Sequence, residues 1–170
     1  MNLYELLEAG HSKKQCDRIV SYIGKDKDRF AGLMRLFLQG EYRITQRAAW
    51  PLSYCVRQHP QLIGPYFKPL LDNLEKPGNH VAVTRNTMRL LQDVDIPKKY
   101  QGRVMNSCFE FIQAPETPIA VKAFSLTVLQ HLSGEYPDIL PELKLIIEEQ
   151  WEQAPPAFRS RAKKILKNMK

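Results

Sequence analysis

A basic residue recurs at an almost constant interval through most of this chain, and a helix-forming run follows each occurrence. The four positions are Arg47, Arg85, Lys122 and Arg161, separated by 38, 37 and 39 residues. A period of this length is typical of a solenoid in which each repeat is one pair of helices. Because such arrays bind through extended surfaces and serve many roles, the spacing constrains the architecture far more than the chemistry.

Apolar residues form a second register that falls in the other helix of each pair. Three sets share a spacing of 38 residues: Phe67, Met105 and Leu143; Leu70, Cys108 and Ile146; Leu71, Phe109 and Ile147. An offset of 37 residues extends the series toward the N-terminus, to Phe30, Leu33, Met34 and Phe37. One face of each of these helices is therefore expected to meet its neighbour in the same way.

Glycine and proline breaks divide the chain into helical segments, and strand signals are absent. Helices are predicted near residues 2–9, 12–22, 28–38, 43–58, 62–76, 80–93, 98–113, 118–132, 138–153 and 156–168. Ser12 and Gln15 have the spacing of a capping box for the second of these helices. Pro51 and Pro69 fall inside predicted helices, where a proline removes a donor and clashes with the preceding turn, so each predicts a kink or a misplaced boundary.

The residues in these registers resemble HEAT-like repeats of the armadillo type. In that pattern a basic residue near the start of the second helix follows an acidic residue by six positions. Here the residues six positions earlier are Glu41, Asn79, Glu116 and Pro155, and Val121-Lys122-Ala123 is the closest match to the pattern. The resemblance covers about residues 27–170. It implies an all-α fold, a right-handed α-α superhelix of about four antiparallel helix pairs of ~38 residues.

No long linker interrupts the chain, so a single domain is expected over residues 1–170. In this interpretation residues 1–26 form N-terminal capping helices, and residues 156–170 form a basic C-terminal capping helix. Such caps are expected because the terminal repeats of a solenoid need a polar outer face.

The recurring basic residues have two interpretations. Each side chain either bonds carbonyls of the preceding turn or points into the concave face of the array, where it is free to contact a ligand. Trp50 and Tyr54, four residues apart beside Arg47, give one repeat an aromatic character that the later repeats lack. Arginine and aromatic residues are common at binding hot spots. The predicted binding surface is therefore Arg47, Trp50, Tyr54, Arg85 and Lys122.

The net charge of +7 is concentrated at the C-terminus. Residues 159–170 hold six of the 25 basic residues and none of the 18 acidic ones, so the rest of the chain carries 19 basic against 18 acidic residues. Five of these side chains are predicted as an anion contact: Arg159, Arg161, Lys163, Lys164 and Lys167. The alternative is a solvated capping helix.

Catalytic and metal-binding patterns are not recognisable. The four histidines are scattered, and Cys16, Cys55 and Cys108 lie apart within apolar patterns, so the cysteines are predicted to be core residues and no metal or cofactor is expected. No apolar stretch has membrane-spanning length and no signal peptide is recognisable, so a cytoplasmic protein without membrane contact is expected.

These features favour a non-catalytic binding module or scaffold that recognises a protein or peptide through its concave face. The alternative is a DNA-binding HEAT-like protein related to alkylpurine DNA glycosylases, which Arg47-Ala48-Ala49-Trp50 faintly resembles. In that family a carboxylate lies beside the damaged nucleotide, and only Asp93 or Asp95, near a helix end, is offered here. No catalytic residue can be assigned, and the sequence does not indicate an oligomeric state.

Overall fold

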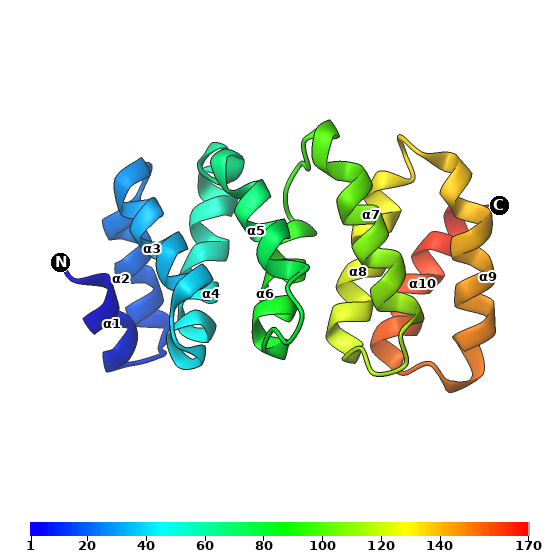
Figure 1. Ribbon diagram of the computed structural model, residues 1–170, viewed down its shortest axis with the longest axis horizontal. Helices are drawn as coiled ribbons and strands as arrows, with labels where there is room; N and C mark the ends of the chain where they lie inside the picture. The colour runs from blue at the N-terminus through cyan, green and yellow to red at the C-terminus, as the bar shows by residue number, and fades with distance from the viewer. Residues whose placement is uncertain (170) are drawn as a thin grey trace. The chain divides into compact units, whose positions relative to one another are not determined.

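The computed structural model describes residues 1–169, which form helices joined by short loops, without any strand among them. The predicted all-α fold of paired helices is therefore confirmed (Figure 1). The chain divides into two compact units, the first being Met1–Asp95 and the second beginning at Ile96. A single domain over residues 1–170 stays a prediction, and Lys170 lies outside the described residues.

The first unit is organised around one long helix. Its elements are α1 (Leu3–Ala9), α2 (Lys13–Ile23), α3 (Lys27–Gln39), α4 (Tyr42–Gln58), the 3-10 helix η1 (Pro60–Tyr66), α5 (Phe67–Leu74) and α6 (Val81–Leu91). α3 packs against α4, its neighbour in sequence, and α2 and α6 each pack against α4 as well. α5 contacts α3 and α6. α4 is thus shared between successive helix pairs, as expected when repeats stack on their neighbours.

The second unit repeats this arrangement. Its elements are α7 (Lys98–Gln113), α8 (Ile119–Leu132), the 3-10 helix η2 (Pro137–Ile139), α9 (Leu140–Gln150), the 3-10 helix η3 (Trp151–Gln153) and α10 (Pro156–Asn168). α7 packs against α8, and α8 packs against α10. Gln101 joins the start of α7 to the segment after α8, because it donates to Glu135 Oε1 at 3.2 Å and accepts from the Tyr136 hydroxyl at 2.7 Å.

Side chains cap α1, α2, α3 and α6 of the first unit at their N-termini, where backbone N–H groups lack partners. Asn2, Ser12 and Asp26 accept from the first turns of α1, α2 and α3, and His80 Nδ1 accepts from Ala82 N at 3.1 Å. Ser12 caps as predicted, but the capping box is incomplete because Gln15 donates instead to the Leu6 carbonyl, at 2.6 Å. Gln15 therefore ties α2 to α1.

Two predicted helices are shorter than expected, and prolines explain both differences. The helix predicted over 62–76 divides into η1 and α5, and Pro69 lies in the first turn of α5, where a backbone N–H would be unpaired in any case. The helix predicted over 138–153 divides into η2, α9 and η3, with Pro141 in the first turn of α9. Pro51, by contrast, lies inside the continuous helix α4.

The apolar register forms the core of each unit. Phe30, Leu33, Met34 and Phe37 on α3, with Phe67, Leu70, Leu71 and Leu74 on α5, are all buried. In the second unit Cys108, Leu143, Ile146 and Ile147 are buried, whereas Met105 and Phe109 are only half-buried. The repeat therefore predicts most of the core-facing positions and overstates the burial of these two on α7.

The three cysteines are buried free thiols, as predicted. Burial is the main cause that raises the pKa of Cys55 and of Cys108 from 9.0 to about 12, because the thiolate is disfavoured away from water. In the unfolded chain these thiols ionise above about pH 9, while the folded chain retains their protons. Their contribution to stability is thus present below pH 9 and is lost as the pH rises toward 12.

This linkage predicts that the free energy of unfolding depends less on pH in Cys108→Ala than in the original chain. Between pH 9 and 11 the free energy of unfolding should fall less steeply in the variant, because one proton-retaining group is gone. Urea unfolding followed by circular dichroism, repeated at several pH values, measures both slopes. Equal slopes would mean that Cys108 ionises alike in the folded and unfolded chains.

Candidate functional site

A polar pocket opens on the first unit where α4 and α6 meet the loop between α1 and α2. Its volume is about 330 Å³. The lining residues are His11 from the loop, Gln46, Ala49 and Trp50 from α4, and Arg85, Asn86 and Arg89 from α6. The pocket thus joins Trp50 and Arg85, two of the residues predicted to bind, to five that were not predicted.

The spacing of these residues along their helices explains why they converge. Gln46 and Trp50 are four residues apart on α4, and Arg85 and Arg89 are four residues apart on α6, so each pair lies on one helix face. The two helices pack against each other, and both also carry buried residues such as Ala48 on α4 and Met88 on α6. Gln46 is exposed, and Trp50, Arg85 and Arg89 are half-buried.

Charge in this pocket is of one sign. Arg85 and Arg89 contribute two guanidinium groups, and no Asp or Glu side chain among residues 1–169 lines the pocket. The Trp50 ring contacts the His11 ring, with centroids 5.2 Å apart and planes tilted by 59°. Guanidinium and amide donors beside an aromatic surface suit a ligand that carries a negatively charged group.

Arg47 faces away from this pocket, toward the end of α1. Its Nη1 donates to the Leu7 carbonyl at 2.9 Å and to the Glu8 carbonyl at 2.7 Å. Of the two roles predicted for the recurring basic residues, these bonds match contact with carbonyls of a preceding turn. Ligand contact by Arg47 stays a prediction.

Tyr54 lies one helical turn beyond Trp50 and does not line the pocket. Lys13 Nζ lies 4.9 Å from the centroid of its ring, and the Arg57 guanidinium lies 5.9 Å from it. Arg57 also donates to Asp93 Oδ2, with Nη2 at 2.7 Å and Nε at 3.1 Å. This ion pair links the end of α4 to the segment after α6.

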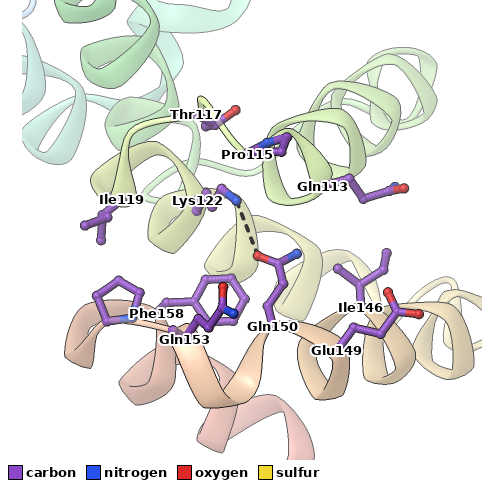
Figure 2. A pocket seen from close by; sticks show the side chains of 12 residues that line it. Gln113, Pro115, Thr117, Ile119, Lys122, Ile146, Glu149, Gln150, Gln153 and Phe158 are labelled. Carbon is purple, nitrogen blue, oxygen red and sulfur yellow. Dashed lines mark hydrogen bonds between the residues drawn. The ribbon is translucent and has the colours of Figure 1, made fainter.

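Lys122, the remaining predicted contact, lines a separate pocket of about 670 Å³ in the second unit (Figure 2). Its Nζ donates to Gln150 Oε1 at 3.3 Å, and Gln150 Nε2 donates to the Ile112 carbonyl at 2.7 Å. Burial lowers the pKa of Lys122, which the negative charge of Glu116 partly opposes. Ile119, Ile146 and Phe158 are apolar residues that also line this pocket (Figure 2).

Comparison with known proteins settles the family. A family model described as a HEAT repeat domain matches residues 3–169. The chain belongs to this family. No curated protein and no solved structure matches the chain. The resemblance predicted for residues 27–170 is confirmed, and the match also takes in α1 and α2 of the HEAT repeat domain.

The basic C-terminal helix of the HEAT repeat domain is partly engaged by its own unit. Arg159 Nε donates to the Trp151 carbonyl at 3.1 Å and its Nη2 to the Glu152 carbonyl at 2.9 Å, while Arg161 Nη1 donates to Thr127 Oγ1 at 2.6 Å. These bonds hold α10 to η3 and α8. Lys163, Lys164 and Lys167 are exposed, and an anion contact by the five predicted residues stays a prediction.

Residues 1–169 of the HEAT repeat domain contain neither a metal-binding cluster of side chains nor a helix suited to cross a membrane. No group of three or more His, Cys, Asp or Glu side chains there is placed to hold a metal ion. Within the same residues no helix has both the length and the apolar content that crossing a membrane requires.

Sequence reasoning missed several pocket residues of the HEAT repeat domain. Arg89 could have been predicted, because it lies one turn after Arg85 on a predicted helix and so shares its face. Gln46 and Asn86 carry no pattern that separates them from other polar residues. His11 lies in a loop, where helical periodicity says nothing about which element its ring approaches.

Proposed function

We propose that this HEAT repeat domain is a non-catalytic binding module that recognises a protein or peptide partner. The contact surface is the exposed side of α4 and α6, centred on Trp50 and Arg85. The observation that supports this proposal is the pocket that joins these two residues. Helical repeats bind extended partners through surfaces of this kind, and aromatic and arginine side chains dominate such contacts.

Tyr54 and Arg57 extend the proposed surface along α4. Tyr54 is half-buried between two cations, and its hydroxyl makes no hydrogen bond with any residue in the described part of the chain. Tyrosine offers a partner a large contact area at little cost in conformational entropy. Lys122 is proposed as a contact through its own pocket in the second unit.

The DNA-binding alternative related to alkylpurine glycosylases has less support. Its chemistry places a carboxylate at the ligand, and in the described part of the chain no carboxylate lines the α4–α6 pocket. Asp93 is already paired with the Arg57 guanidinium. Exposed Lys163, Lys164 and Lys167 are the feature of this chain that best fits a phosphate backbone.

Peptides selected from a displayed random library against the full chain provide the test. Trp50→Ala and Arg85→Gln should each weaken binding of the selected peptides about tenfold, since each removes a central contact of the surface. Fluorescence anisotropy measures the affinity, and circular dichroism checks that helicity and melting are retained. A library that yields no peptide sensitive to either substitution would contradict the proposal.

The same assay with a labelled short DNA duplex tests the alternative. At near-physiological salt we expect little binding, and whatever binds should depend on the C-terminal lysines. The variant Lys163→Gln, Lys164→Gln, Lys167→Gln is the matched control. Tight duplex binding that survives both the salt and this triple substitution would favour the DNA-binding function instead.

A further inference from the structure

Several polar side chains around the α4–α6 pocket form no hydrogen bonds or ion pairs with other described residues. The guanidinium groups of Arg85 and Arg89 make no hydrogen bond or ion pair with another residue among 1–169, and the side chain of Gln46 makes none there either. In contrast, Arg47, Arg57 and Arg159 each bond an acceptor at 2.7–3.1 Å. Two half-buried guanidiniums without acceptors indicate donors kept available for a ligand.

Asn86 provides an independent indication. This residue lines the pocket and is only 9% exposed, yet its Nδ2 is buried without a hydrogen-bond partner. An unpaired buried donor destabilises the folded state, so such groups are uncommon unless something satisfies them in another state. Rotation about χ2 of asparagine is soft, and no bond to the described residues holds the amide of Asn86 in place. The amide is thus free to turn its NH2 group toward an acceptor in the pocket.

We propose that the α4–α6 pocket is an oxyanion site that binds one carboxylate or phosphate group. Arg85 and Arg89 supply charge-assisted donors, and the amide of Asn86 supplies a neutral one. Trp50 forms an aromatic wall beside them, against which the apolar stem of an acidic side chain packs. A volume of about 330 Å³ accommodates a whole side chain rather than a bare ion.

If the chain is the peptide-binding module proposed above, the oxyanion comes from an acidic or phosphorylated side chain of the partner. A nucleic acid fits less well, because a phosphate backbone needs a track of positive charge. Up to residue 158 the chain carries 19 basic against 18 acidic residues. A positive pocket in a stretch of chain whose charges nearly cancel suits a single anchoring group.

The site is tested by measuring how the full chain binds three labelled peptide mixtures. Each mixture has randomised flanks around a fixed central residue, which is serine, phosphoserine or glutamate. The phosphoserine and glutamate mixtures should bind at least about tenfold more tightly than the serine mixture, because only they present an oxyanion. Inorganic phosphate should displace both. Equal binding of all three mixtures would overturn the proposal.

Substitutions locate the site. Arg85→Gln and Arg89→Gln should each lower the affinity for the phosphoserine mixture about tenfold. Asn86→Leu should lower it severalfold while the melting temperature stays the same or rises, because leucine removes an unpaired buried amide at similar volume. Arg43→Gln is the control, since Arg43 is exposed on α4 and does not line the pocket. Losses no larger than that of the control would overturn the assignment.

Binding of inorganic phosphate alone tests the oxyanion site separately from the proposed peptide-binding function. In a Trp151→Phe background Trp50 is the single tryptophan, so its fluorescence reports on the pocket directly. A phosphate-dependent change in fluorescence that Arg89→Gln abolishes would support the oxyanion site. If no peptide bound in that case, only the peptide-binding function would be contradicted. A DNA duplex that binds in an Arg89-dependent way, without peptide binding, would overturn the peptide source.

Discussion

Phe30→Ala should destabilise the first unit by about 3–5 kcal/mol, the usual cost of emptying a buried phenylalanine site. The Phe30 side chain on α3 is fully buried, and its ring meets the Tyr66 ring edge-on with centroids 5.6 Å apart. The substitution removes both the buried area and this aromatic contact. Urea unfolding followed by circular dichroism measures the loss of free energy.

Val81→Ala is the matched control for Phe30→Ala in the same unit. Val81 begins α6 and is 47% exposed, so shortening it should change the free energy of unfolding by less than about 0.5 kcal/mol. If the two variants lost similar amounts, the 37-residue register that pairs Phe30 with Phe67 would not describe the core.

Arg47→Met should cost about 2 kcal/mol of stability. The substitution keeps a long apolar stem but leaves the Leu7 and Glu8 carbonyls without the guanidinium that donates to both. The stability of Arg47→Lys should lie between that of the original chain and that of Arg47→Met, because an ammonium retains the charge but not the fork of donors. Thermal and urea unfolding report these differences.

The same variants decide which role Arg47 has. Peptide affinity of folded Arg47→Met should stay within about threefold of the original, because its guanidinium is directed at α1. Arg43→Met, one turn earlier on α4 and exposed, should change neither stability nor affinity appreciably. Unchanged stability together with lost affinity in Arg47→Met would instead make Arg47 a ligand contact.

The fold was predictable because its determinants are periodic. Buried positions on α3 and α5, such as Phe30 and Phe67, repeat at a fixed offset, and any sequence with that register must bury the same face repeatedly. Helix boundaries were less predictable near Pro65, Pro69 and Pro141. A proline is tolerated in the first turn of a helix as well as in a kink, and the sequence alone does not distinguish the two.

The candidate site was only partly predictable, since it depends on which neighbours surround each side chain. Trp50 was identified by the aromatic character of its repeat and Arg85 by the recurring basic register, and both line the pocket. Arg47 carried the same signal, yet its role follows from where α1 ends, which the basic register does not encode. The importance of Asn86 comes from a buried amide without a partner, a property of packing rather than of residue type.

The way each helix packs on elements close to it in the chain also bears on how the molecule folds. α3 meets α4, α7 meets α8, and α4 and α8 reach no further than the next-but-one helix for their main contacts within their units. Chains whose contacts are local close only short loops before native interactions form, so they fold quickly. We expect each helix pair to gain structure soon after its second helix leaves the ribosome, without waiting for the C-terminal end to be made.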